Sequence, residues 1–366
     1  MLRFFTLLLI NISLNQAQWW YPWESCTEDW VNFDDSALLT DLQKDVFGQD
    51  LVIDIVMAAL KGHFDHPSKK ALVLSFHGPP GTGKNFVANK IVKSIYKENM
   101  KSSFVKLFHK SRDFAHDTPA KIIEYKDKIQ AAIEKTTASC ERSLFIFDEV
   151  HLMKNELMNA LKSYIDYNPL VGNVDYRKTI FIFLSNSGSK EVNKLAIKYY
   201  TDGLDRNAIP LDEIQDGVLR TIYNEESSGF WNCELLRAHL ISQTIPFLPL
   251  EIAHVRKCIE RDALSKGLRF NFDVVNEVLK YLTLFPKNSP LFVQEGCKVV
   301  EAKVDLLIPQ TSSSHCYKIK NILNPVTYQP QQFPMNNEFD PTILSNPYFI
   351  LPLHVRPNQQ WDILLI

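Results

Sequence analysis

Apolar residues between positions 50 and 184 alternate between short continuous runs and longer stretches with helical periodicity. Short continuous apolar runs are typical of strands that are buried on both faces of a sheet. We predict four such strands, at residues 71–76, 104–108, 144–147 and 180–184. Apolar residues that recur every three or four positions predict amphipathic helices at residues 50–60, 84–96, 119–135 and 156–164. Strands that alternate with helices predict an α/β fold with a largely parallel, doubly wound sheet.

The pattern changes after Tyr223. A polar break that contains glycine covers residues 226–229, and the apolar stretch 245–250 carries two prolines. Three helical patterns follow, at residues 251–265, 272–281 and 295–307. We therefore predict a large α/β domain at residues 46–230 and a small α-helical lid domain at residues 245–307.

Both ends of the chain lack the patterns of its centre. Arg3 precedes an apolar run that gives way to small and polar residues near Ala17, which predicts a signal peptide at residues 1–17. The run is shorter than the ~20 residues that span a bilayer, and an uncleaved anchor is the alternative. Residues 18–45 have no clear periodicity and are predicted to form an N-terminal arm. Residues 308–366 are rich in Ser, Pro, Asn and Gln and are predicted to form an irregular tail.

The composition is that of a globular protein. Of the 366 residues, 45% are hydrophobic and 22% are charged, and the net charge is −2, so nothing predicts binding to nucleic acid. The length predicts two structural units. Four aromatic residues after the predicted cleavage site are suited to packing on the domain or to peripheral contact with a membrane surface. They are Trp19, Trp20, Tyr21 and Trp23.

A phosphate-binding motif stands between a predicted strand and a predicted helix. It reads Gly78-Pro79-Pro80-Gly81-Thr82-Gly83-Lys84-Asn85, which is the P-loop pattern. The glycines let the loop fold tightly, so that backbone N–H groups face phosphate oxygens while Lys84 neutralises the β and γ charges of ATP. Asn85 stands where Ser or Thr normally offers a hydroxyl to Mg²⁺. We expect its amide oxygen to face the ion directly or through water.

Polar residues with roles in hydrolysis follow two of the predicted strands. Asp148 would hold Mg²⁺ or its water shell, and Glu149 would orient the water that attacks the γ-phosphoryl group. Asn186 follows the strand at 180–184, and its amide could contact the γ-phosphate or that water. Lys298, at the head of the last predicted helix, could reach the γ-phosphate and report nucleotide state to the small domain.

Several of these segments resemble the torsins. They are the P-loop ending in Gly-Thr-Gly-Lys-Asn, Tyr176-Arg177-Lys178 followed by residues 181–186, residues 245–251, and Gly296-Cys297-Lys298. The resemblance covers roughly residues 24–307; the departures are Pro80 and the chain beyond about residue 308. It implies a Clp-like AAA+ ATPase of the endoplasmic reticulum lumen and nuclear envelope, with ATP and Mg²⁺ at the site.

The resemblance also implies a partner. Torsins lack their own arginine finger, and here the segment where Clp-type relatives place it reads His239-Leu240-Ile241-Ser242, with Arg237 as the nearest guanidinium. The family's partners are membrane-anchored proteins with lumenal AAA-like activator domains, and a homo- or hetero-oligomer would bring one to the site. The C-terminal Asp362-Ile363-Leu364-Leu365-Ile366 is no retention signal, so we expect partners or membrane contact to retain the protein.

A signal peptide implies an oxidising compartment, in which the six cysteines can form disulfides. They lack the short paired spacing of a zinc site, and the sequence leaves their pairing open. By resemblance to torsins, Cys258 pairs with Cys297, either to couple redox state to the reach of Lys298 or to stabilise the fold. Cys26 would pair with Cys140 and tie the N-terminal arm to the large domain. Two cysteines, Cys233 and Cys316, have no torsin counterpart that we can name.

Three functions are compatible with these features. The first is an activator-dependent ATPase that remodels protein complexes as a chaperone does. The second is a nucleotide-gated scaffold that binds ATP and partners with little hydrolysis, which the replacement of a hydroxyl by Asn85 and the missing arginine suggest. The third, a P-loop kinase or small-molecule phosphotransferase, explains neither Asn186 and Lys298 nor the C-terminal helices.

Overall fold

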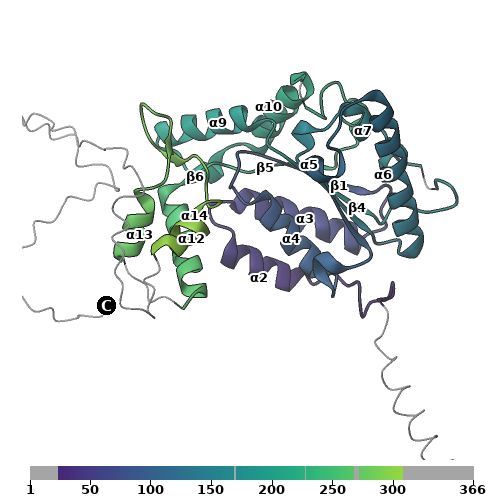
Figure 1. Cartoon of the computed structure of the whole chain (residues 1–366), viewed down its shortest axis with the longest axis horizontal. Helices are drawn as coiled ribbons and strands as arrows, with labels where there is room; N and C mark the ends of the chain where they lie inside the picture. Colours follow the sequence, from purple (N-terminus) through teal and green to yellow (C-terminus); the bar gives the residue numbers. More distant parts are fainter. Residues whose placement is uncertain (1–23, 169, 227, 268–271, 308–366) are drawn as a thin grey trace, which may run out of the picture. The chain divides into compact units, whose positions relative to one another are not determined.

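The computed structural model describes residues 24–307, apart from 169, 227 and 268–271 (Figure 1). The predicted signal peptide, the aromatic residues from Trp19 to Trp23, Cys316 and the predicted tail lie outside the described residues. Within the part that the structure describes, no helix is long and apolar enough to cross a bilayer.

A five-stranded parallel sheet forms the centre of the α/β part. Its strands are paired in the order β2-β3-β4-β1-β5, and each of the four pairings is parallel. The strands are β1 (Leu72–His77), β2 (Val105–His109), β3 (Leu144–Asp148), β4 (Ile180–Ser185) and β5 (Gln243–Pro246). The strands predicted at 71–76, 104–108, 144–147 and 180–184 are therefore confirmed to within one residue at each end.

Alternate residues of the central strands face two separate apolar cores because successive side chains of a strand point to opposite faces. Phe181 and Phe183 of β4 belong to one core, and Ile180 and Ile182 belong to the other. Both faces are covered by helices, which explains why these strands read as continuous apolar runs rather than as alternating ones.

Helices on the two sides of the sheet fill these cores (Figure 1). One side carries α2 (Asp35–Asp45), α3 (Asp50–Asp65) and α4 (Lys84–Ile95). The other side carries α6 (Pro119–Ser139), α7 (Asn155–Asn159), α8 (Lys162–Ile165), α9 (Ser189–Thr201) and α10 (Leu211–Asn224). Shorter turns of helix are η1 (Asn99–Lys101), α5 (Lys110–Asp113), η2 (Val150–Leu152), η3 (Arg206–Ala208) and α11 (Glu234–Arg237).

The helices differ from the prediction in three respects. The segment predicted as an arm without periodicity contains α2, which the Asp34 carboxylate caps by accepting from the Ala37 N–H at 2.8 Å. Leu38 and Leu42, one turn apart, place this helix in the core. The helix predicted at 156–164 is two short helices, α7 and α8. The apolar pattern did not predict α9 and α10.

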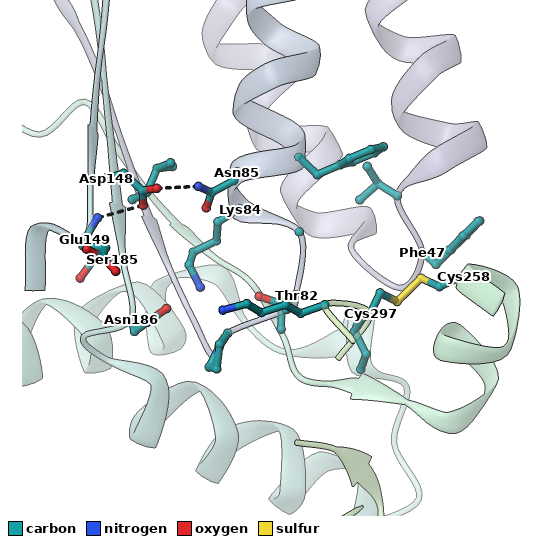
Figure 2. Close-up of a pocket in the computed structure, with 18 of the residues that line it drawn as sticks. Phe47, Thr82, Lys84, Asn85, Asp148, Glu149, Ser185, Asn186, Cys258 and Cys297 are labelled. Carbon is teal, nitrogen blue, oxygen red and sulfur yellow. Dashed lines mark hydrogen bonds between the residues drawn. A yellow bond between two sulfur atoms is a disulfide. The ribbon is translucent and has the colours of Figure 1, made fainter. Parts of the chain in front are cut away.

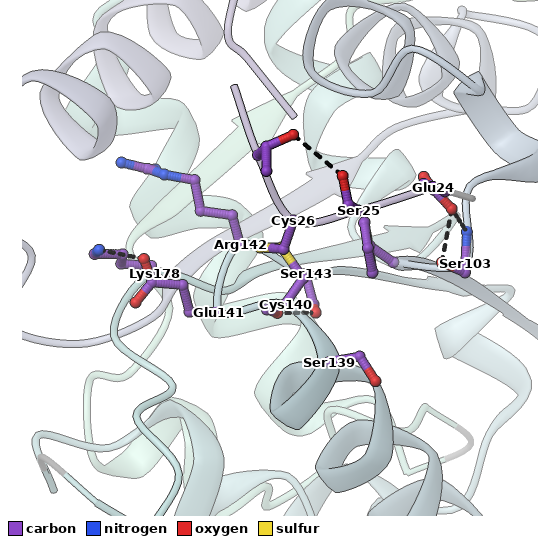
Figure 3. Close-up of a disulfide and its surroundings, with 12 residues drawn as sticks. Glu24, Ser25, Cys26, Ser103, Ser139, Cys140, Glu141, Arg142, Ser143 and Lys178 are labelled. Carbon is purple, nitrogen blue, oxygen red and sulfur yellow. Dashed lines mark hydrogen bonds and ion pairs between the residues drawn. A yellow bond between two sulfur atoms is a disulfide. The ribbon is translucent and has the colours of Figure 1, made fainter. Parts of the chain in front are cut away.

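The N-terminal segment is tied to the α/β part by covalent and polar contacts (Figure 3). The predicted disulfide between Cys26 and Cys140 is present and joins it to the residue that follows α6. The Glu24 carboxylate accepts from the backbone N–H and the hydroxyl of Ser103, each at 2.6 Å. This segment is therefore fixed beside the start of β2.

The C-terminal described part combines helices with a small sheet. The helices are α12 (Ile252–Ser265), α13 (Phe272–Leu279) and α14 (Val300–Leu307), and the antiparallel strands are β6 (Leu250–Glu251), β8 (Phe292–Val293) and β7 (Leu284–Phe285). A third apolar core lies among them. The small α-helical domain was predicted without this sheet. The described residues all belong to one compact unit, so the domain bounds at 46–230 and 245–307 stay predictions.

The last helix begins at Val300 rather than at Glu295. Gly296, Cys297 and Lys298 therefore lie in a turn before α14 and not within its first residues. Gly296 has a left-handed φ of 50°, a conformation that cannot lie inside a right-handed α-helix, so the helix begins after it.

Candidate functional site

A cavity of about 490 Å³ lies beyond the carboxyl ends of β3 and β4, beside the N-terminus of α4 (Figure 2). This is the usual position of ligand sites in parallel sheets. The structure brings most of the predicted site residues to its wall. They are Pro80, Gly81, Thr82, Gly83, Lys84, Asn85, Asp148, Glu149, Asn186 and Lys298.

The P-loop connects β1 to α4. Gly81 and Gly83 adopt φ values of 76° and 107°, which few residues other than glycine reach, and Gly83 is the residue that precedes the helix. Lys84 donates from Nζ to the carbonyl oxygens of Gly78 at 2.6 Å and Pro79 at 2.8 Å. Burial lowers the pKa of Lys84 to about 7. An anion that enters the cavity would stabilise the charged ammonium form of this side chain.

Gln49, which the sequence analysis did not single out, fixes the P-loop from behind. Its side chain is buried, and Nε2 donates to the carbonyl oxygens of Thr82 at 3.2 Å and Leu248 at 2.8 Å. Its Oε1 accepts from the Leu248 N–H at 3.0 Å. Gln49 thus joins the start of α3, the P-loop and the segment after β5.

Asp148 and Glu149 stand at the end of β3, facing Asn85. Asn85 Nδ2 donates to Asp148 Oδ2 at 2.7 Å, and the Glu149 N–H donates to Asp148 Oδ1 at 2.9 Å. Glu149 has a left-handed φ of 60°, a conformation that is rare outside glycine and that turns the chain sharply after the strand. Ser111 donates to Glu149 Oε2 at 2.8 Å, and His109 Nδ1 lies 3.5 Å from the same oxygen.

The residues at this end of the cavity fit Mg²⁺. Asp148 offers a carboxylate, and Asn85 offers an amide oxygen once Nδ2 is bound to Asp148. Among the described residues, no group of three or more His, Cys, Asp or Glu side chains forms a metal cage. Sparse protein ligation is what Mg²⁺ needs at nucleotide sites, because waters and substrate phosphates complete its octahedron.

Asn186 follows β4, and polar contacts fix its loop. Its backbone N–H donates to His151 Nδ1 at 3.2 Å, and its Nδ2 lies 3.3 Å from His151 Nε2. The next residue, Ser187, presents its carbonyl oxygen to Nδ1 of fully buried His77 at 3.1 Å. Burial lowers the pKa of His77 to about 4, so its ring is neutral at physiological pH and carries one N–H.

The segment that carries Lys298 packs directly on the P-loop. The Cys297 N–H donates to the Gly81 carbonyl oxygen at 3.0 Å, and a Cβ on Gly296 would lie 2.4 Å from that oxygen. The predicted disulfide between Cys258 and Cys297 is present and lines the cavity. Residues separated by more than 200 positions thus meet, and the lid contacts the loop that would hold phosphates.

Comparison with known proteins identifies the family. The Torsin family model matches residues 20–147, and the model of the Torsin-1A C-terminal domain matches residues 250–307. A torsin-like protein of Caenorhabditis elegans is 37% identical over 303 residues, which cover 81% of this chain and 84% of that protein. Torsin-3A of Rattus norvegicus is 34% identical over 276 residues, which cover 75% of this chain and 69% of that protein. The chain belongs to the torsin family.

Solved structures confirm the predicted fold of this torsin family member. The S. cerevisiae Hsp104–ADP complex matches with a TM-score of 0.50 at 16% identity, over 75% of this chain and 46% of the Hsp104 chain. A closed state of Hsp104 with ATPγS and FITC casein matches with a TM-score of 0.51 at 15% identity, over the same shares of the two chains. The likeness shows the α/β AAA+ fold alone. Family and fold together support a torsin-like AAA+ ATPase that binds nucleotide.

The end of the cavity remote from Glu149 was not predicted by the sequence analysis of this torsin. The Arg261 guanidinium lies 5.5 Å from the ring centre of Phe47 and 5.1 Å from that of Phe86. It also donates from Nη1 to the Asp45 carbonyl oxygen at 2.7 Å. Within the described residues, Arg261 is the only arginine that lines the cavity; Arg237, at the end of α11, does not.

Cys233 is a free, buried thiol whose Sγ donates to Asn159 Oδ1 at 3.2 Å. Burial raises its pKa to about 11, so the thiol stays protonated at physiological pH and is a structural residue. The pair with Cys316, which the sequence leaves open, falls outside the described residues.

Proposed function

We propose that this torsin family member hydrolyses ATP at the cavity described above, and that a partner protein supplies an arginine finger. The observation that carries the proposal is the convergence of the P-loop, Glu149 and Asn186 on one cavity whose only described arginine, Arg261, already contacts Asp45 and two aromatic rings. An arginine finger contributes ~10³–10⁵ to the rate, so a site without one turns over slowly.

Each predicted residue has a task in this scheme. The N–H groups of the P-loop and of the start of α4 bind the triphosphate, and Lys84 turns from the carbonyls of Gly78 and Pro79 to the phosphate oxygens. Glu149 orients the attacking water, a task that depends on the position of its carboxylate at the end of β3. Asp148 and Asn85 would hold Mg²⁺, in part through water, and the bound ion would supply positive charge against the phosphates.

The two remaining residues read the γ-phosphate. Asn186 contacts it, or the attacking water, from the end of β4. Lys298 contacts the γ-phosphate from the lid. Because the Cys297 N–H donates a hydrogen bond to the Gly81 carbonyl oxygen, a change at the phosphates is transmitted to the small domain. The apolar and aromatic residues near Phe47 leave the remote end of the cavity for the adenine base.

We further propose that the protein works in the endoplasmic reticulum lumen and the perinuclear space. There it would oligomerise with a membrane-anchored, lumenal AAA-like activator and remodel protein complexes in the manner of a chaperone. The family assignment supports this setting, and so do the two disulfides, which persist in oxidising compartments.

The test is ATP turnover by the purified chain, alone and with the lumenal domain of a candidate activator. We expect little turnover alone and stimulation of at least ~10³-fold with the activator, as an arginine finger provides. Glu149→Gln is the control and should bind ATP without hydrolysing it. Stimulation that survives Glu149→Gln would show that the activity belongs to another site or to a contaminant, and the proposal would be rejected.

One contact favours a second function, that of a nucleotide-gated scaffold. Oδ2 of Asp148 already accepts a hydrogen bond from Asn85, and Asn85 has no hydroxyl to offer Mg²⁺. A scaffold would bind ATP tightly but hydrolyse none with any activator. Partner release would then follow nucleotide exchange and be the same for wild type and Glu149→Gln, whereas an ATPase would release its partner faster as wild type.

A further inference from the structure

The side chain of His77 joins the strand before the P-loop to the loop that carries Asn186. His77 is the last residue of β1 and directly precedes Gly78, the first residue of the P-loop. Its ring is fully buried. Nδ1 lies 3.1 Å from the carbonyl oxygen of Ser187, and Nε2 lies 2.7 Å from Oγ of Ser75. The two ring nitrogens thus face two different residues, and the proposed function gives this histidine no task.

The Ser187 carbonyl decides which ring nitrogen of His77 carries the hydrogen. A carbonyl oxygen can only accept, so Nδ1 must carry the hydrogen and donate it. Burial lowers the pKa of the ring to about 4, so the ring is neutral at physiological pH and has no second hydrogen. Nε2 is therefore the acceptor, and the Ser75 hydroxyl donates to it. One tautomer satisfies both contacts.

Side chains from two neighbouring strands fix the backbone of Ser187. Its N–H donates to Oγ of Ser185 at 3.0 Å, and its carbonyl oxygen accepts from His77. Ser185 of β4 is the partner of His77 in the register of β4 against β1. All three residues are buried. Loss of the imidazole N–H would therefore leave a buried carbonyl oxygen unpaired, and the loop would have to move to pair it.

The same histidine stands next to a residue that contacts the P-loop lysine. The carbonyl oxygen of Gly78 accepts from Lys84 Nζ at 2.6 Å. Lys84 and Asn186 both line the cavity (Figure 2), and Asn186 directly precedes Ser187. The ring of His77 is thus a direct link between the start of the P-loop and the Asn186 loop.

We propose that His77 is a positioning residue: by donating from Nδ1 to the Ser187 carbonyl, it holds Asn186 where the amide reaches the γ-phosphate. The inference rests on the proposed nucleotide function. ADP has no γ-phosphate, so the P-loop binds both nucleotides and Asn186 distinguishes them. Loss of the link lowers the preference for ATP over ADP, whereas a general disturbance of the P-loop weakens both alike. His77 touches no nucleotide atom and acts through Asn186.

Two substitutions separate the donated hydrogen bond from the volume of the ring. In His77→Asn the amide nitrogen is as many bonds from Cα as Nδ1 and can donate to Ser187. In His77→Gln the amide is as many bonds away as Nε2, so it keeps the contact with Ser75 and loses that with Ser187. Ser75→Ala removes only the partner of Nε2. His63→Asn is the matched control: His63 is also buried, and its Nε2 faces the Lys178 carbonyl oxygen at 3.3 Å, but it does not line the cavity.

The experiment measures Kd for ATP and for ADP in the purified chain with Glu149→Gln as background, so that hydrolysis does not interfere. We expect His77→Gln and Asn186→Ala each to lower the ATP-to-ADP preference about tenfold, the value of one hydrogen bond to a charged group. The double variant should lose no more than either single one, because both changes remove the same contact. The variants that should keep the wild-type preference are His77→Asn, Ser75→Ala and His63→Asn.

Several results would overturn the inference. It is wrong if His77→Gln keeps the preference while Asn186→Ala loses it, if His77→Gln weakens ATP and ADP equally, or if the two losses add. Equal losses in His77→Gln and His77→Asn would also contradict it, because the volume of the ring and not its donor would then decide the preference. A chain that binds neither nucleotide would instead refute the proposed function.

A second measurement does not require nucleotide. Nitrogen NMR of the ¹⁵N-histidine-labelled chain distinguishes the two neutral tautomers, and the signal that Ser75→Ala shifts belongs to His77. We expect a hydrogen on Nδ1 and none on Nε2. A hydrogen on Nε2 would overturn the inference even if ATP binds. A chain that has the Nδ1 hydrogen but binds neither nucleotide would refute the proposed function and leave the contact with Ser187 correct.

Discussion

Gln49 provides a direct test of how the P-loop is supported. The Gln49→Ala change removes the amide that donates to the carbonyl oxygens of Thr82 and Leu248 and accepts from the Leu248 N–H. All of these groups are buried. An unpaired buried polar group costs ~1–3 kcal/mol, and the 3.2 Å contact to Thr82 is the weakest of the three. We therefore expect the free energy of unfolding to fall by roughly 3 kcal/mol.

Urea unfolding followed by tryptophan fluorescence measures this loss, and an ATP titration measures its effect on the site. The ATP Kd should rise, because the Thr82 carbonyl is no longer fixed and the P-loop loses its preset shape. Gln43→Ala, at an exposed position of α2, is the matched control and should stay within about 0.5 kcal/mol of wild type. A loss below about 1 kcal/mol for Gln49→Ala would refute the reasoning, since it would mean that water or a neighbour replaces the amide at little cost.

Three other perturbations test the contact between the lid and the P-loop, and the charge of the P-loop residue Lys84. Gly296→Ala places a Cβ 2.4 Å from a P-loop carbonyl oxygen, so ATP affinity should fall at least ~10-fold. Gly267→Ala is the control, because Gly267 also has a left-handed backbone but lies in open space, and it should leave ATP affinity unchanged. Replacing Cys258 and Cys297 by Ser opens a link across 39 residues and should lower the free energy of unfolding by roughly 4 kcal/mol in urea. The pKa of Lys84, about 7 instead of 10.5, makes stability rise with pH between those values, because only the unfolded chain keeps the proton there. At pH 8, ATP binding should restore the charge of Lys84 and take up most of a proton, which calorimetry in two buffers measures. The absence of proton uptake would refute the low pKa.

The sequence alone determined the local chemistry of the site. The P-loop is one continuous segment, and Asp148, Glu149 and Asn186 directly follow apolar strands. Since the carboxyl ends of parallel strands meet at one edge of a sheet, the pattern was enough to predict that these residues converge. The torsin resemblance added both disulfide pairs, whose spacing carries no such information.

Tertiary structure alone decided which residues support this chemistry. The order β2-β3-β4-β1-β5 places Asn186 beside the P-loop, and no local pattern encodes strand order. Gln49, Ser111 and His77 belong to no motif; each gains its role from a hydrogen bond to a residue that its own segment does not predict. Long-range contacts also decide the secondary structure of segments with weak periodicity. The helix α2 is an example, because its buried face packs in the core. A sequence motif contains the groups that contact the ligand. The groups that hold those ligand-binding residues in place depend on packing, and packing depends on the whole fold.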